Sequence, residues 1–251
     1  MFSIRTVKLL ESRDALREIP QGKVLINTLN AHSYNIALKD GAFAEALAGG
    51  DVLLPDGMSI VKACRWLKAR SRPRERVAGW DLFVEEMAAL NARGGKCFFL
   101  GSSEVVLGKI RERAARDYPA IDVETYSPPF KQEFSSGDDR AMIDAVNASD
   151  PDLLWIGMTA PKQEKWAYAH WDRLDIHCHC GTIGAVFDFY AGTVRRAPLW
   201  MQKAGLEWLY RLASEPRRLW RRYTAGNAAF VLNCIREAAA RPRQPDNLCS
   251  E

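Results

Sequence analysis

Apolar runs of strand length alternate with amphipathic stretches of helical length through the first three quarters of the chain. The strand-like runs lie at residues 23–31, 51–57, 96–102, 122–127, 152–158 and 175–181. The helical stretches lie between them, at residues 33–50, 58–70, 80–95, 103–119, 138–150 and 162–174. Strands and helices in alternation indicate parallel βαβ units. We therefore expect a Rossmann-like, mostly parallel α/β sheet with helices on both faces.

The pattern changes at about residue 195, where strand signals end and arginine and tryptophan become frequent. Residues 195–251 carry eleven Arg and Lys against five Asp and Glu, a net charge of +6, whereas residues 1–194 carry −2. This segment predicts two or three helices, one of them starting at Pro216, and a polar, disordered end. We expect an α/β domain at residues 1–194 and a C-terminal helical, basic appendage at residues 195–251.

The composition is that of a folded globular protein, with 47% hydrophobic and 26% charged residues in 251. No apolar run approaches the roughly 18 residues of a spanning helix, and charges within the first 14 residues argue against a signal peptide. The six cysteines are then expected to be reduced thiols. These features predict a cytoplasmic protein without a transmembrane span.

Polar side chains stand where two of the predicted strands end. Asp56 ends the run DVLLPDG, and ligands collect at the carboxyl ends of strands in sheets of this kind. Thr28 and Asn30 are two apart in INTLNAHS, so in an extended segment their side chains point the same way. Each site has a plainer interpretation, because Asn30 can cap the helix near Ser33 and Asp56 can cap the helix after it. The residues alone leave both interpretations open.

A strand, a tight turn and a helix start meet in FLGSSEVV. Backbone N–H groups around Gly101 and Ser102 could hold a phosphate there. The dinucleotide fingerprint GxGxxG and the phosphate loop GxxxxGK[ST] are both absent from the sequence. Hydride transfer on a dinucleotide and P-loop nucleotide hydrolysis are therefore disfavoured.

Two further stretches carry polar groups at element boundaries. Gln163 and Glu164 begin a helix in GMTAPKQEKW, where they could be favourable partners of the helix dipole or part of a site. Arg76 and Asp81 flank Gly79 in RERVAGWDLF, and a surface ion pair between them is the simplest interpretation.

Two metal-like patterns do not fit a metal site. In HCHC, a strand would put His177 and His179 on one face and both cysteines on the other, which matches no usual zinc spacing. The acidic pair in SSGDDR lies at the start of a helix, where acids are expected. We expect no bound metal and no other cofactor.

Several of these stretches occur together in a known order. They are INTLNAHSYNIAL, VLLPDGMSIV, RVAGWDLF, FFLGSSEVV, PDLLWIGMTAPKQEKW and GAVFDFYAGTVRRAPLWMQKAGLEWLYRLASEPRRLWRR. In order and spacing they closely resemble the WecG/TagA/CpsF glycosyltransferases, glycosyltransferase family 26, over about residues 23–225. The resemblance implies transfer of a sugar from a UDP-sugar to a polyprenyl-diphosphate-linked sugar, with inversion and without a metal. It also implies a place in bacterial surface polysaccharide biosynthesis, on the cytoplasmic face of the membrane.

The resemblance assigns roles to residues already singled out. Asp56 matches the proposed catalytic aspartate, a base that takes the proton of the acceptor hydroxyl. Thr28 and Asn30 match a TxN pair beside it that binds a sugar or orients the base. Arg76 matches an arginine that could carry the developing charge of the diphosphate.

The donor side is implied in the same way. Gln163 matches a residue near the donor sugar, and Glu164 is its less certain neighbour. Gly101 and Ser102 are expected to line the nucleotide pocket. The family often has glycine near Thr159, Ala160 and Thr182, so the transferred sugar stays open among N-acetylmannosamine, its uronic acid, glucose and others.

The appendage gains a role through the family, in which it is linked to membrane association and to arginines that complete the active site. It has five basic residues interleaved with Trp and Leu: Arg211, Arg217, Arg218, Arg221 and Arg222. These predict a basic amphipathic helix pair on an anionic membrane surface, with Arg217 and Arg221 also expected to contact substrate. The plainer interpretation is a packed helix whose arginines are solvated.

Two other functional classes stay open from the residues. A hydrolase of a nucleotide-sugar or nucleoside on the same fold would use Asp56 as a base toward water. A nucleic-acid binder is suggested by the Arg and Trp tail, but the α/β part is slightly acidic and no nucleic-acid motif is recognised. We expect no nucleic-acid partner, and a homo-oligomer is compatible with the apolar faces around residues 197–213.

Overall fold

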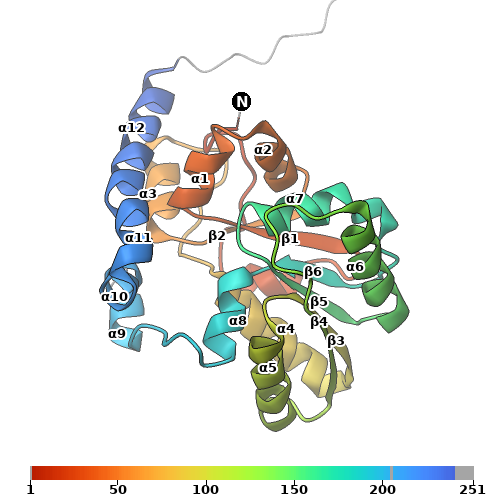
Figure 1. Ribbon diagram of the computed structural model, residues 1–251. Coiled ribbons are helices and arrows are strands. Elements are labelled where there is room, and N and C mark those ends of the chain that lie inside the picture. The colour runs from red at the N-terminus through yellow and green to blue at the C-terminus, as the bar shows by residue number, and fades with distance from the viewer. Residues whose placement is uncertain (1, 204–205, 241–251) are drawn as a thin grey trace, which may run out of the picture.

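The computed structural model describes residues 2–203 and 206–240, and they form one six-stranded parallel sheet flanked by helices (Figure 1). The strands are β1 (Val24–Leu29), β2 (Val52–Pro55), β3 (Gly95–Gly101), β4 (Ile121–Tyr126), β5 (Leu153–Gly157) and β6 (His179–Thr182). Their order across the sheet is β2-β1-β6-β5-β3-β4, and every neighbouring pair is parallel. The predicted Rossmann-like α/β class is confirmed.

Helices connect the strands and continue beyond the last one. Before β6 these are α1 (Ala31–Ala37), α2 (Gly41–Ala48), α3 (Met58–Trp66), α4 (Gly79–Arg93), α5 (Glu104–Asp117), α6 (Ser136–Ser149) and α7 (Lys162–Ala169), with 3₁₀ turns η1 (Asp14–Glu18) and η2 (Trp171–Arg173). After β6 they are α8 (Gly184–Tyr190), α9 (Leu199–Lys203), α10 (Glu207–Ser214), α11 (Pro216–Tyr223) and α12 (Ala225–Ala239). The helical stretch predicted at 33–50 is two helices, because the Asp40 carboxylate accepts from the N–H of Phe43 and starts α2.

Both faces of the sheet are buried, as a parallel sheet requires. In β3, Cys97 and Phe99 point to the face covered by α4, α5 and α8, whereas Phe98 and Leu100 point to the face covered by α6 and α7. The inner strands β3 and β5 consequently contain continuous apolar runs, which is why the sequence pattern located them.

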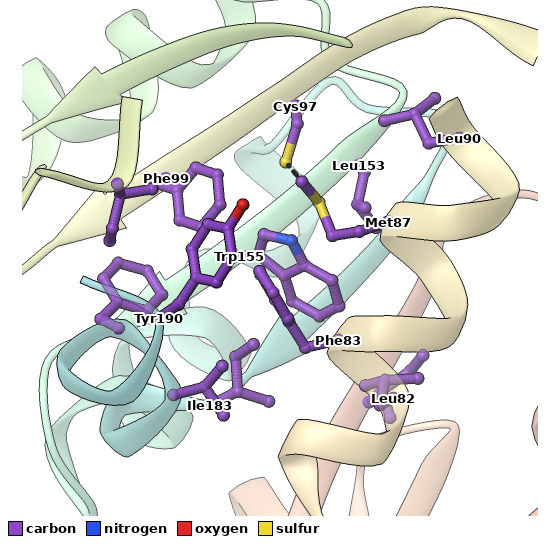
Figure 2. Packing of buried hydrophobic residues seen from close by; sticks show 14 of the residues in the cluster. Leu82, Phe83, Met87, Leu90, Cys97, Phe99, Leu153, Trp155, Ile183 and Tyr190 are labelled. Atoms are coloured by element: carbon purple, nitrogen blue, oxygen red, sulfur yellow. Dashed lines mark hydrogen bonds between the residues drawn. The ribbon is translucent and has the colours of Figure 1, made fainter. Parts of the chain in front are cut away.

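Aromatic rings fill the core between the sheet and α4, α5 and α8 (Figure 2). Trp155 in β5 is fully buried, with its ring centroid 5.6 Å from that of Phe83, and the Phe83 ring lies 4.7 Å from Tyr190. A Cβ at Gly181 in β6 would come within 2.4 Å of the Trp155 indole. Glycine is therefore needed beside this tryptophan.

The sixth strand differs from its predicted bounds of 175–181. It begins at His179, because β1 begins at Val24 and Val24 is the residue opposite His179, so earlier residues have no strand to pair with. His177 is exposed, whereas His179 is buried between Glu86 and the Pro20 carbonyl. The prediction that the two histidines share a strand face was wrong.

The C-terminal segment forms four helices in its described part, where two or three were predicted. Pro216 is the first residue of α11, as predicted. Helix α12 lies beside α1 and α3 (Figure 1), and its Phe230 and Cys234 belong to the same apolar cluster as Tyr34 and Cys64. The end predicted to be disordered, residues 241–251, lies outside the described residues.

Candidate active site

A cavity of about 760 Å³ lies at the carboxyl ends of β1, β2 and β6. Its floor includes Thr28, Asp56 and Thr182, and residues of α8 and of α10 to α12 complete its wall. Crevices at the carboxyl ends of parallel strands are the usual ligand sites of such sheets. A volume of this size can hold a sugar nucleotide or a comparable ligand.

Asp56 follows the last residue of β2 and points into this cavity. Its N–H donates to the Leu29 carbonyl at 2.8 Å, which ties the loop to β1. Gly57, with φ of +152°, is the N-cap residue of α3, and no side chain among the described residues caps that helix. The capping interpretation of Asp56 is therefore not the one the structure adopts. The carboxylate is left available, with 32% of its side-chain surface exposed to the cavity.

The surroundings of Asp56 make it a stronger base than an ordinary aspartate. Removal from bulk water raises the pKa of Asp56, the positive charge of Arg76 lowers it, and the negative charges of Glu207 and Asp81 raise it. The net effect is a raised pKa. A carboxylate with a raised pKa binds a proton more strongly, which is what a general base requires.

Arg76 reaches the cavity from the loop before α4, and its partner is not the predicted Asp81. Its Nη1 donates to Glu207 Oε2 at 2.7 Å, and its Nε lies 4.0 Å from Asp56 Oδ1. Asp81 instead accepts from the N–H of Ala78 at the start of α4. Arg76 thus connects the end of β2 with helix α10.

Thr28 and Asn30 both line the cavity beside Asp56. Asn30 lies just past β1, and its Oδ1 accepts from the N–H groups of His32 and Ser33 at 3.0 Å each. The N-cap interpretation of Asn30 is confirmed, and it does not take the residue out of the cavity wall. Thr28, still within β1, presents its side chain at the carboxyl edge of the sheet.

Gln163 joins two of the loops that line the cavity. Its Oε1 accepts from the N–H groups of Met158 and Gly184 at 3.2 Å each, and its Nε2 donates to Glu164 Oε1 at 2.9 Å. A Cβ at Gly184 would lie 2.6 Å from Gln163 Oε1, so a larger residue there would displace the Gln163 amide. Gln163 is almost fully buried, which makes it a positioned side chain and not a solvated helix-start residue.

Glu164 is buried behind Gln163 in the wall of the same cavity. Burial raises the pKa of Glu164 to about 7, although the hydrogen bond from Gln163 lowers it. Its Oε2 has no hydrogen-bond partner in the part of the chain that is described. A carboxyl in this state is half protonated near neutral pH.

Gly101 and Ser102 are not among the described residues that line this cavity. Gly101 is the last residue of β3 and Ser102 follows it, with the Ser102 N–H donating to the Gly157 carbonyl at 3.0 Å. A Cβ at Gly101, whose φ is +120°, would lie 2.5 Å from the same carbonyl. The close approach of β3 and β5 accounts for this glycine without a phosphate.

Arg217 and Arg221 lie one turn apart on the exposed surface of α11, away from the cavity wall. The side chains of Arg218 and Arg222 lie outside the described part of the structure. From the same basic segment, Arg211 does line the cavity, with its guanidinium 5.4 Å from the Phe189 ring centroid.

Sequence reasoning missed Glu207 and Arg196, which complete the polar wall. Glu207 Oε1 lies 3.3 Å from Arg196 Nε, and the Arg196 guanidinium lies 4.9 Å from the Trp80 ring centroid. Burial raises the pKa of Glu207, but the two arginines outweigh it and hold that pKa below its usual range. The available signal was an acid in a stretch with a large excess of arginine and lysine, which indicates a paired carboxylate.

Within residues 2–203 and 206–240, no group of three or more His, Cys, Asp or Glu side chains could hold a metal ion. In the HCHC segment, the ring nitrogens of His179 are hydrogen-bonded to the Glu86 carboxylate and the Pro20 carbonyl. No helix in the described residues is long and apolar enough to cross a membrane.

Comparison with known proteins gives a consistent assignment. The sequence pattern described as the glycosyl transferase WecG/TagA/CpsF family matches residues 2–244. A similar protein is the N-acetylglucosaminyldiphosphoundecaprenol N-acetyl-beta-D-mannosaminyltransferase of Bacillus subtilis (strain 168), 30% identical over 79% of this chain and 74% of that protein. The protein of the same name from Bacillus spizizenii is 30% identical over 74% of this chain and 69% of its own length.

Proposed function

Because the chain belongs to the WecG/TagA/CpsF family of glycosyl transferases, we propose that it moves a sugar from a UDP-sugar to a polyprenyl-diphosphate-linked saccharide, with inversion. The observation that carries this proposal is Asp56, a carboxylate with a raised pKa that faces a large cavity beside Arg76. The names of the two similar proteins describe transfer of N-acetylmannosamine to N-acetylglucosaminyl-diphosphoundecaprenol. Such a step belongs to bacterial surface polysaccharide synthesis.

The reaction is a single displacement at the anomeric carbon. Asp56 accepts the proton of the acceptor hydroxyl while that oxygen forms its bond to the sugar. The bond from the sugar to the diphosphate breaks, and UDP leaves with the electron pair. We propose that Thr28 and Asn30, which line the same cavity, bind sugar hydroxyls near the base.

The leaving diphosphate gains negative charge, and arginines can stabilise it without a metal ion. Arg76 and Arg211 both line the cavity. The Arg211 guanidinium packs 5.4 Å from the Phe189 ring centroid, which holds its positive charge at the cavity wall. This arrangement supports a metal-independent transfer.

On the donor side we propose that Gln163 and Glu164 lie near the transferred sugar. Thr159, Ala160 and Thr182 line the same cavity, at positions where the family often has glycine. Their side chains reduce the space available to the donor sugar. We propose that they determine which sugar this enzyme accepts, in contrast to family members with glycine there. Gly101 and Ser102 remain our proposal for the far end of the nucleotide.

The acceptor lipid resides in a bilayer, so the enzyme has to work at a membrane surface. We propose that it binds peripherally to the inner face of the cytoplasmic membrane through α10 and α11. Trp220 is 59% exposed between Arg217 and Arg221, a combination suited to an anionic interface. In this proposal residues 195–251 act as the membrane-associating part of the enzyme.

The test is UDP release from a panel of UDP-sugars, with and without a short-chain polyprenyl-diphosphate monosaccharide, in the presence of EDTA. We expect acceptor-dependent release from the intact chain and a loss of at least about 100-fold in Asp56→Asn. Asp144→Asn, on the exposed surface of α6, is the matched control and should retain activity. Release without acceptor would instead assign a hydrolase, and inhibition by EDTA would contradict the metal-free step.

A further inference from the structure

Arg76 lies between two carboxylates and is much closer to one of them. Its Nη1 is 2.7 Å from Glu207 Oε2, whereas its Nε is 4.0 Å from Asp56 Oδ1. All three side chains line the cavity. Arg76 therefore makes its short ion pair with Glu207 of α10, and its ion pair with Asp56 is long.

Glu207 is itself held from two sides. Arg76 binds one of its carboxylate oxygens and Arg196 Nε lies 3.3 Å from the other. The guanidinium of Arg196 packs over the Trp80 ring at the start of α4. Only 14% of the Glu207 side chain is exposed, so solvent screens these pairs weakly.

An arginine without this competitor would pair differently. A guanidinium prefers a short, two-pronged contact with a carboxylate, and Asp56 is the second carboxylate with which Arg76 forms an ion pair. Such a contact would occupy the lone pairs of Asp56 that have to receive a proton. It would also bring a full positive charge against them.

We propose that Glu207 is a positioning residue that holds Arg76 away from Asp56, so that Asp56 stays an effective proton acceptor. This inference rests on the proposed role of Asp56 as the base. Because Glu207 lies on α10, the base is fully effective only while α10 is docked on the α/β domain. The C-terminal helices thereby contribute to the chemical step through a residue that does not touch the reacting atoms.

The charges around Asp56 give this proposal a definite direction. Arg76 and Arg211 lower the pKa of Asp56, whereas Glu207 and Asp81 raise it. The cavity wall also carries Lys62 of α3 and His32 of α1, which a Glu207 substitution does not change. Loss of the Glu207 charge removes a raising influence and frees Arg76 to approach. Both effects lower the pKa of Asp56, so removal of an acid makes its neighbour a weaker base.

The experiment is a carbon-13 NMR titration of the Asp56 carboxyl without substrate, with the signal assigned by its loss in Asp56→Asn. In Glu207→Gln we expect the pKa of Asp56 to fall by about one unit. Glu112→Gln, an exposed acid on α5, is the matched control and should leave it unchanged. An Asp56 pKa that stays the same or rises in folded Glu207→Gln would overturn the proposal.

A second variant covers the case in which Glu207→Gln does not fold. Glu207→Asp keeps the charge but shortens the side chain, so the pKa of Asp56 should fall by a smaller amount. In transfer assays, Glu207→Gln should move the acid limb of the pH profile to lower pH and lower kcat about tenfold, with little change in donor KM. The titration needs no turnover, so absence of transferase activity would defeat the proposed function and leave this test standing.

Discussion

The hydroxyl of Tyr34 on α1 donates a hydrogen bond to Glu237 on α12, 203 positions later in the chain. The other oxygen of Glu237 accepts from the N–H of Arg5 at 2.9 Å and from the hydroxyl of Ser3. The Phe230 ring stands edge-on to Tyr34, with the centroids 5.5 Å apart. Helix α12 is thus fastened to the N-terminal segment and α1 by both polar and apolar contacts.

We predict that Tyr34→Phe destabilises the fold by about 1–3 kcal/mol, because the half-buried Glu237 loses the hydrogen bond donated by the buried Tyr34 hydroxyl. Urea denaturation followed by circular dichroism measures this change. Tyr168→Phe, at a half-exposed tyrosine on α7, is the control and should cost much less. Equal losses in the two variants would mean that the bond to Glu237 contributes nothing to stability.

The division of the chain at residue 194 stays a prediction, and α12 gives it a physical limit. Phe230 and Cys234 are buried in the cluster that contains Tyr34, so a truncation that removes α12 exposes core surface. The sequence pattern could not reveal this. A helix with one apolar stripe looks the same whether it packs on the domain, on a second copy or on a bilayer.

The strands and their carboxyl-end residues were accessible to sequence reasoning for a simple reason. Strands buried on both faces read as unbroken apolar runs. The carboxyl ends of parallel strands lie at one edge of the sheet, so Asp56, Thr28 and the loop before Gln163 could be expected there together. Glu207 and Arg76 are 131 positions apart, and no local pattern pairs them. For Gly101 the sequence leaves two interpretations open, since a strand-turn-helix signal does not distinguish a phosphate turn from close strand packing.

We predict that Gly184→Ala impairs transfer although it alters no polar group. The added methyl would lie 2.6 Å from Gln163 Oε1, so Gln163 has to leave the N–H groups of Met158 and Gly184. Activity should fall by at least about tenfold, because a shift of one ångström in a positioning residue is costly. The control is Gly108→Ala on α5, where a Cβ would have no atom of the described residues within 4 Å. Full activity in Gly184→Ala would remove Gln163 from the site.

Glu164 should make stability depend on pH near neutrality. Its pKa of about 7 in the folded chain exceeds the ordinary value of 4.5, so the folded state holds the proton more tightly. The resulting stability is fully present below pH 4.5 and is lost as the pH rises through 7, by about 3 kcal/mol in all.

Denaturant midpoints at pH 5 and pH 8 measure this effect when the wild type is compared with Glu164→Gln. The pKa of His179 is also raised, because the effect of Glu86 outweighs the lowering effect of burial. The stability that His179 contributes to the fold is therefore also lost as the pH rises. Only the difference between wild type and Glu164→Gln isolates Glu164. A difference that does not change between the two pH values would contradict the buried, protonated carboxyl.

The exposed side of α11 should decide membrane binding without deciding chemistry. Leu219 is buried, whereas Arg217, Trp220 and Arg221 face outward, so the helix offers a basic and aromatic surface. We predict that the double substitution Arg217→Glu and Arg221→Glu weakens binding to anionic vesicles by at least about 30-fold, since each basic residue near the surface contributes about 1 kcal/mol. Co-sedimentation at several salt concentrations measures it, with Lys109→Glu and Arg116→Glu at exposed positions of α5 as the charge-matched control. Transfer to a short-chain, soluble acceptor should fall only if these arginines also contact substrate, so the two assays separate attachment from catalysis.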